Sequence, residues 1–112
     1  MSKPTYLGEF EQMVLWAVLR MDGEGYGATI LTELSDRVGR AVTTGALYAT
    51  LDRLEQKEMI RSHLADPEAG RGGRRKRYMS VTAEGRAELA RVRQEWTHLW
   101  EGTDVLLGAN EP

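Results

Sequence analysis

The densest cluster of charged residues in the chain runs from Arg71 to Arg77, where five of seven residues are Arg or Lys. Guanidinium and ammonium groups at this density can neutralise phosphates and release the counterions that surround a nucleic acid. Such contacts carry no sequence information, so a second group of residues is needed to read bases. The alternative is a solvated hairpin whose basic residues only keep the protein soluble.

A second candidate group precedes the basic cluster, on a segment with helical spacing that Thr43 or Thr44 can cap. The inward stripe of this helix consists of Leu47, Leu51 and Leu54. Outside the stripe, the first half of the helix is small, hydroxylic and nearly uncharged, with Thr44, Gly45 and Tyr48 as its main members. A helix that approaches a groove of a duplex closely needs residues of this kind. Thr43, Thr44, Gly45 and Tyr48 are therefore candidate DNA contacts.

Some of these side chains have two candidate roles. Tyr48 either offers its hydroxyl to a phosphate or packs as a half-buried ring on its own helix. Arg53 either contacts DNA or pairs with a nearby acidic residue. Arg71 or Arg74, near the tip of the basic segment, could enter a minor groove, because narrow A-tracts attract arginine.

Two strands are expected to carry the basic cluster. Residues 59–65 alternate moderately between apolar and polar side chains, and residues 77–82 form a return strand in which Tyr78 and Val81 favour β structure. The loop between them is rich in Pro and Gly and cannot be helical. The pattern predicts an antiparallel hairpin with a basic tip.

Two helices are expected before these elements. Residues 9–21 are apolar almost all round the helix, which indicates burial on more than one side. One side would face the domain core and another a partner subunit, with Phe10 and Trp16 as candidate interface residues. Residues 25–38 form the second helix, which Gly39 ends.

The last helix is expected to span residues 83–108, with Thr82 as its cap. Its apolar residues follow a heptad-like spacing: Leu89, Val92, Trp96, Leu99, Thr103 and Leu106, with Trp100 beside them. A helix of about 24 residues is roughly 36 Å long, more than a three-helix core needs. Its far half therefore predicts a symmetric homodimer. The alternative is a helix that folds back on its own domain.

The composition limits the classes of protein to which this chain can belong. The chain has 112 residues, no cysteine and a net charge of −2, which fits one domain without disulfides or thiolate metal sites. The net charge is +4 within residues 40–80 and −3 on either side, so the positive charge is confined to one segment. No apolar run is long enough to span a bilayer, and no signal-peptide pattern is present at the start. We expect a cytoplasmic protein that does not contact a membrane.

Catalysis has little support in the sequence. His63 and His98 lie far apart, and no nucleophile motif accompanies them. The run from Gly70 to Gly73 lacks the lysine and helix start of a phosphate-binding loop. We expect a protein that is not an enzyme and that needs no cofactor or metal.

Three stretches of the chain resemble the PadR family of bacterial transcriptional regulators: GYGATILTEL, VTTGALYATLDRLEQKEMI and RRKRYMSVTAEGRAEL. The resemblance covers Leu7 to Leu89, and the short C-terminal segment is similar to the short-tailed subgroup. It implies an α+β, mostly helical fold, a winged helix-turn-helix with a long C-terminal dimerisation helix. Residues 1–82 would be the DNA-binding domain and residues 83–108 the dimerisation helix of the same compact unit.

The resemblance also implies a function and a set of contacts. Family members are homodimeric DNA-binding regulators, usually repressors, with the third helix in the major groove and a wing along the backbone. The residues that carry over are Thr44, Gly45 and Tyr48 on the helix, and Arg75, Lys76 and Tyr78 on the wing. The chain departs from the family pattern at three positions: Ala49 in place of Pro, Glu58 in place of Gly, and Arg77 in place of a second tyrosine.

Two further hypotheses follow. Some relatives bind flat aromatic effectors between subunits, and Trp16, Trp96 and Trp100 are the candidate residues for such a small aromatic ligand. Their apolar surface would also serve a dimer interface without any ligand. The competing function is a winged-helix protein-interaction module that does not bind DNA.

Overall fold

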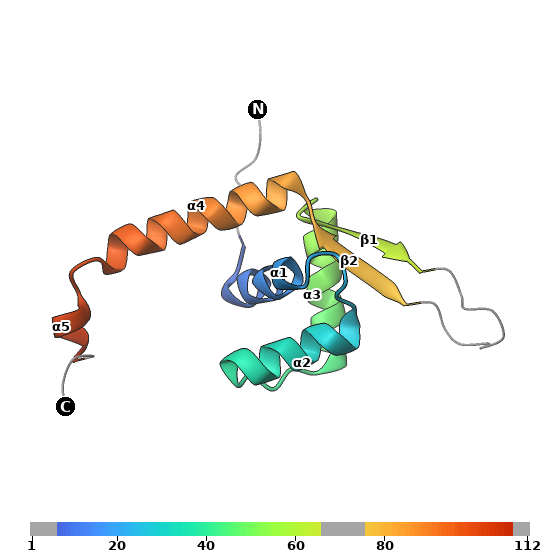
Figure 1. Cartoon of the computed structure of the whole chain (residues 1–112), viewed down its shortest axis with the longest axis horizontal. Helices are drawn as coiled ribbons and strands as arrows, with labels where there is room; N and C mark the ends of the chain where they lie inside the picture. Colours follow the sequence, from blue (N-terminus) through green and yellow to red (C-terminus); the bar gives the residue numbers. More distant parts are fainter. Residues whose placement is uncertain (1–6, 66–75, 109–112) are drawn as a thin grey trace.

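The computed structural model describes residues 7–65 and 76–108, which form three helices, a hairpin and two more helices (Figure 1). Along the chain the elements are α1 Glu9–Met21, α2 Gly27–Val38, α3 Thr44–Gln56, β1 Ile60–Leu64, β2 Arg77–Val81, α4 Ala83–Trp100 and α5 Asp104–Leu107. The α+β, mostly helical winged-helix arrangement expected from the sequence is confirmed. Among the described helices, none is both long and apolar enough to cross a membrane.

Local chemistry explains most of the element ends. The side-chain oxygens of Thr43 and Thr82 accept hydrogen bonds from the backbone N–H groups of Ala46 (3.0 Å) and Gly85 (2.9 Å). Each threonine thereby satisfies an N–H group that the first helical turn leaves unpaired. Gly39 ends α2 in the left-handed conformation, with φ of 65°. These three signals were read correctly from the sequence.

The start of α2 differs from the expectation. The helix begins at Gly27 rather than Gly25, because Gly25 is extended and bridges to β2. The backbone N–H of Met79 donates to the carbonyl of Gly25 over 2.9 Å. The segment before α2 therefore runs beside the hairpin, an arrangement that depends on distant residues.

The hairpin pairs β1 with β2 in antiparallel register, from Ile60 opposite Val81 to Leu64 opposite Arg77. Its tip, residues 66–75, lies outside the described residues, and so do Arg71, Arg74 and Arg75. Lys76 and the strands themselves are described. The structure therefore defines the base of the wing but not the contacts of its tip.

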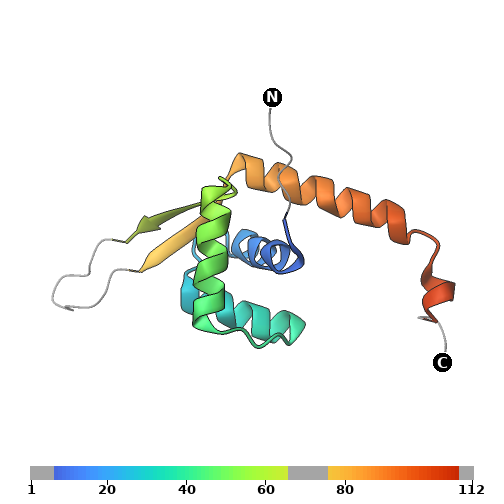
Figure 2. The same cartoon turned by 180° about the vertical axis from the view of Figure 1, so that it is seen from behind.

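Helix α1 occupies the centre of the domain. It contacts α2, α3, α4 and β2, and its residues Val14, Leu15, Ala17 and Val18 are buried. In Figures 1 and 2 it lies between α4 and α2, with α3 crossing beside it. Its burial on several sides was expected, but elements of the same chain provide much of it. Phe10 and Trp16 are partly buried against this core.

The C-terminal segment is not the single helix expected from the sequence. Helix α4 ends at Trp100, Gly102 takes a φ of 77°, and the short α5 follows. The backbone leaves the helical region at Glu101, with ψ of 131°, and the left-handed Gly102 follows, so the apolar spacing up to Leu106 does not continue α4. The first half of α4 packs on the domain, and its far half projects away from it (Figure 1).

Candidate nucleic-acid interface

The N-terminal half of α3 exposes the face that was predicted to enter a groove. Thr44 and Gly45 are exposed, and a β-carbon added at Gly45 would have no atom within 4 Å. Tyr48 is 39% exposed on the same side of the helix. The opposite stripe, Leu47, Leu51 and Leu54, is fully buried in the core. Packing on one side and small residues on the other leave this face free for another molecule.

Tyr48 links α3 to the start of α2. A β-carbon at Gly27 would overlap the hydroxyl of Tyr48, so the two helices approach closely at this point. Gly27 therefore has a steric reason to lack a side chain. The ring of Tyr48 is partly exposed and its hydroxyl lies against α2 rather than on its own helix, while its contact with a phosphate stays a prediction.

A group of aromatic and basic side chains surrounds the base of the wing. The ammonium of Lys76 lies 4.5 Å from the centre of the Tyr26 ring and 3.4 Å from its hydroxyl. The ring of Tyr78 meets Tyr26 edge to face at 5.5 Å and stacks on His63 at 5.8 Å. Lys76 is thus held over an aromatic ring, a favourable cation–π position that leaves the residue exposed.

Tyr26 and His63 were not predicted from the sequence to belong to this group. His63 faces Tyr78 because the two residues are paired across the ladder. Tyr26 reaches the wing because Gly25 bridges to β2, which no local pattern predicts.

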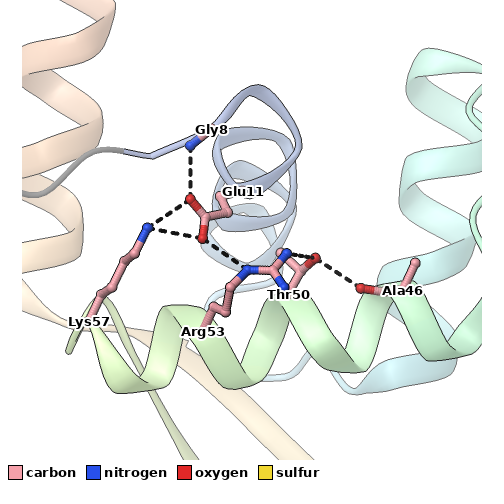
Figure 3. Close-up of polar contacts among 6 residues, drawn as sticks. All are labelled: Gly8, Glu11, Ala46, Thr50, Arg53 and Lys57. Carbon is pink, nitrogen blue, oxygen red and sulfur yellow. Dashed lines mark hydrogen bonds and ion pairs between the residues drawn. The ribbon is translucent and has the colours of Figure 1, made fainter.

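Arg53 is half-exposed and pairs with residues of its own chain (Figure 3). Its Nε donates to Glu11 Oε2 over 3.4 Å, and its Nη2 donates to Thr50 Oγ1 over 3.1 Å. The acidic partner is on α1, not among the neighbours considered from the sequence. Of the two alternatives for Arg53, the structure shows an ion pair, although with Glu11. The predicted DNA contact by Arg53 would compete with this pair.

Glu11 is the centre of that group of contacts. It is only 7% exposed, and its carboxylate accepts from the backbone N–H of Gly8 (2.8 Å) and from the ammonium of Lys57 (2.9 and 3.1 Å). Burial by itself raises the pKa of Glu11, but the Gly8 and Lys57 hydrogen bonds together outweigh it and leave the pKa lowered. An ionised carboxylate therefore joins the start of α1 to the end of α3.

Arg77 also turns toward α3. Its guanidinium pairs with Glu55 at 2.5 Å and with Asp52 at 3.5 Å. The charge that replaces the second wing tyrosine is thus directed at α3. Across residues 7–65 and 76–108, no group of three or more acidic, histidine or cysteine residues could hold a metal ion.

Comparison with known proteins places this architecture in a family. Residues 15–91 match the model of the transcriptional regulator PadR-like family. The chain belongs to this family. An uncharacterised protein of Lysinibacillus sphaericus is 32% identical over 102 residues, which cover 89% of each chain.

Two solved PadR family regulators have the same fold. The structure of a PadR family transcription regulator from Clostridium difficile has a TM-score of 0.71 and 25% identity, covering 88% of this chain and 99% of that one. A PadR family transcriptional regulator from Eggerthella lenta has a TM-score of 0.69 and 25% identity, covering 91% and 88%. Transcription regulation through a DNA-binding winged helix is the function that the family supports.

One departure from the PadR pattern has a structural explanation. Glu58 has φ of 64°, in the left-handed region that glycine adopts without strain. The glycine usual in PadR proteins suits this backbone better than glutamate does. The structure gives no reason for Ala49 in place of proline.

The tryptophans of this PadR-like protein lie in two separate places. Trp16 lines an apolar cavity of about 260 Å³ between α1 and α2, with Arg20, Glu33 and Arg37 among its other lining residues. Trp96 and Trp100 stack on each other at 6.5 Å on the far half of α4. A single chain therefore does not bring the three tryptophans into one pocket.

The remaining interface candidates differ in exposure. Leu89 and Val92 are 1% and 8% exposed, buried in their own chain, so they have little surface left for a partner. Leu99 and Leu106 are 69% and 84% exposed. Among the described residues, the exposed apolar side chains at the C-terminal end of this PadR-like protein are therefore those of Trp96, Leu99, Trp100 and α5.

Proposed function

We propose that this protein binds duplex DNA sequence-specifically as a homodimer and represses transcription. The observation that carries the proposal is the continuity of its outer face. The exposed start of α3 leads through Tyr48 to the start of α2, and Tyr26 there contacts Lys76 of the wing. A groove-reading helix and a backbone-contacting wing need this proximity.

The charge distribution supports the same proposal. Lys76 adjoins Arg71, Arg74 and Arg75, whose positions are outside the described residues but whose charges belong to the same segment. This segment would neutralise phosphates, while Thr43, Thr44, Gly45 and Tyr48 meet base edges and nearby phosphates. Tyr78 would stabilise the base of the wing through its aromatic contacts. Repression is proposed because PadR regulators usually repress.

Exposed apolar surface supports dimerisation. Trp96 and Trp100 are 50% and 54% exposed and form one patch with Leu99 on a helix that projects from the domain (Figure 2). A contiguous apolar surface of this kind marks an interaction site. A symmetric pair of such helices would cover both patches at once, with Phe10 and Trp16 as further candidates.

An aromatic effector is the further candidate for the same region. Two stacked, half-exposed tryptophans offer flat surfaces on which a planar aromatic molecule can stack. In a dimer, the partner's patch would close the other side of the site. Quenching of tryptophan fluorescence by planar aromatics tests this, and Trp96→Leu should abolish the quenching.

The function is tested by selecting duplexes from a random DNA pool and titrating binding against salt. We expect a pseudo-palindromic preference and an affinity that falls steeply with salt. Replacing Arg75 and Lys76 by Ala should weaken binding similarly on selected and random DNA and reduce the salt slope. Wild-type protein that shows no salt-dependent binding to any duplex would instead favour the protein-interaction module.

A further inference from the structure

The start of β2 is tied to the C-terminal half of α3 by polar contacts. Arg77 Nη2 donates to Glu55 Oε1 over 2.5 Å, and Arg77 Nη1 lies 3.5 Å from Asp52 Oδ1. From the other strand, Ser62 Oγ donates to Glu55 Oε2 over 2.8 Å. Glu55 therefore holds both strands of the hairpin at once.

The contacts of Arg77 act far from the point where the hairpin leaves α3. The chain passes from α3 to β1 through Lys57, Glu58 and Met59, and Ile60 and Val81 pair next to that turn. Arg77 lies at the opposite end of the ladder, opposite Leu64, where the chain continues into the wing tip. A contact at this end resists tilting of the hairpin about the turn more effectively than a contact beside it.

Consecutive residues around the start of β2 contact two different elements. Side chains alternate between the faces of a strand. Arg77 contacts α3, while Lys76 and Tyr78 on either side contact Tyr26 ahead of α2. The position of Lys76 is thus set by two contacts, one on each side of the strand.

The ion pair requires the carboxylate of Glu55 to be ionised, and its surroundings favour the ionised form. The hydrogen bond from Ser62 is the largest influence and lowers the pKa of Glu55; burial raises it, and Arg77 lowers it further. Glu55 and Arg77 are both partly exposed, so their contribution to global stability is small. The stability of the fold does not depend on this pair, which leaves positioning as its effect.

We propose that Glu55 and Arg77 are positioning residues that fix the wing against α3, so that Lys76 and the Thr44–Tyr48 face meet one duplex at a set spacing. The inference rests on the proposed DNA binding. Without the Glu55–Arg77 pair, the wing base would sample several tilts, and binding would have to restrict them. That restriction would reduce the affinity for DNA even though the proposal gives Glu55 and Arg77 no contact with a base.

The main rival explanation is that Arg77 simply binds a phosphate. The two explanations predict opposite effects of Glu55→Gln. This change removes a negative charge near the DNA, so electrostatics alone would tighten binding. Loss of positioning would weaken it. The sign of the effect therefore separates them.

The experiment measures binding of full-length Glu55→Gln, Arg77→Gln and the double variant to two duplexes: the tightest one selected from a random pool, and a random-sequence duplex. Glu58→Gln is the matched control. Glu58 is exposed and lies three residues after Glu55 in the chain, and the change also removes one negative charge. Urea unfolding of each variant shows that it is folded.

We expect each single variant to bind the selected duplex about fivefold more weakly, the size of a modest coupling between sites. The double variant should lose no more than either single variant, and the salt slope of Glu55→Gln should match wild type. Glu58→Gln should bind as tightly as wild type or slightly more tightly. Random DNA should show smaller losses, because non-specific binding needs no set spacing.

Two results would overturn the proposal. One is Glu55→Gln binding the selected duplex as tightly as wild type. The other is Arg77→Gln lowering the salt slope by about one phosphate contact, which would make Arg77 a direct phosphate ligand. If wild type itself binds no duplex, the proposed function fails instead. Non-additive urea stabilities of the two single variants would still report the Glu55–Arg77 pair in that case.

Discussion

Glu58 has an unfavourable backbone conformation that its replacement can relieve. A β-carbon in the left-handed region costs about 1–2 kcal/mol, and glycine avoids that cost. Part of the gain is offset by the greater freedom of glycine in the unfolded chain. We therefore expect Glu58→Gly to raise the free energy of unfolding by about 1 kcal/mol, measured by urea denaturation.

A charge effect must be separated from this backbone effect. Glu58 also places a negative charge near the end of α3, which is mildly unfavourable. Glu58→Gln removes the charge and keeps the β-carbon, so it should gain only a few tenths of a kcal/mol. Equal gains for Gln and Gly would show that the strain argument is wrong.

The lowered pKa of Glu11 predicts that the free energy of unfolding depends on pH. Its folded pKa lies below the usual carboxyl value, so its stabilising effect is fully present above that value. The effect is lost as the pH falls through the folded pKa. At pH 7, Glu11→Gln should cost about 1–2 kcal/mol, between values typical of exposed and buried ion pairs.

Unfolding of wild type and Glu11→Gln should be compared at pH 7 and at about pH 3. The difference between them should shrink at the lower pH, because protonated glutamate and glutamine are both neutral. Glu9→Gln is the control on the same helix, since the pair that Glu9 forms with Arg40 at 3.2 Å is exposed. A Glu11→Gln deficit that persists unchanged at low pH would contradict the assignment.

At the scale of elements, the far half of α4 is predicted to contact the second subunit of a dimer. Leu99→Glu changes a residue that is 69% exposed in one chain, so the subunit should remain folded. In the proposed dimer, each subunit would lose about 1.5–3 kcal/mol of apolar burial. We expect dimerisation to weaken at least about a hundredfold, measured by analytical ultracentrifugation.

Gln94→Glu provides the control for Leu99→Glu, because it introduces the same charge at another exposed position of α4. It should leave the association unchanged. A Leu99→Glu protein with the sedimentation of wild type would move the interface away from Trp96, Leu99 and Trp100.

The sequence allowed the elements with local causes to be predicted closely. The apolar pattern gave α1 with its bounds, and threonine caps gave the starts of α3 and α4. The break after Trp100 was missed, because the heptad-like spacing continues across Gly102 and hides its effect. The contacts of Tyr26 and Glu11 were missed as well, since both depend on residues more than 40 positions away in the chain.

At the scale of the whole molecule, one subunit offers a short helix face and one wing. Such a unit contacts few base pairs, so it would bind weakly and with little selectivity. In the proposed dimer, two subunits joined at α4 would make the second contact intramolecular, which would raise the overall affinity without any new contact. The paired arrangement requires the two half-sites to be at a distance that the dimer can span.

That requirement predicts how binding depends on the spacing of the half-sites. A two-fold dimer of such helices should read half-sites about 34 Å apart, one turn of the duplex. Inserting five base pairs between the half-sites of the selected duplex turns one of them to the opposite face. We expect the affinity to fall to that of a single half-site, a loss of about a hundredfold or more.

Fluorescence anisotropy with labelled duplexes measures this dependence. The control duplex changes the sequence of the spacer but not its length, and it should retain most of the affinity. If the five-base-pair insertion binds as tightly as the original, each subunit must read DNA independently. In that case the apolar patch of α4 would have to serve some contact other than a rigid DNA-reading dimer.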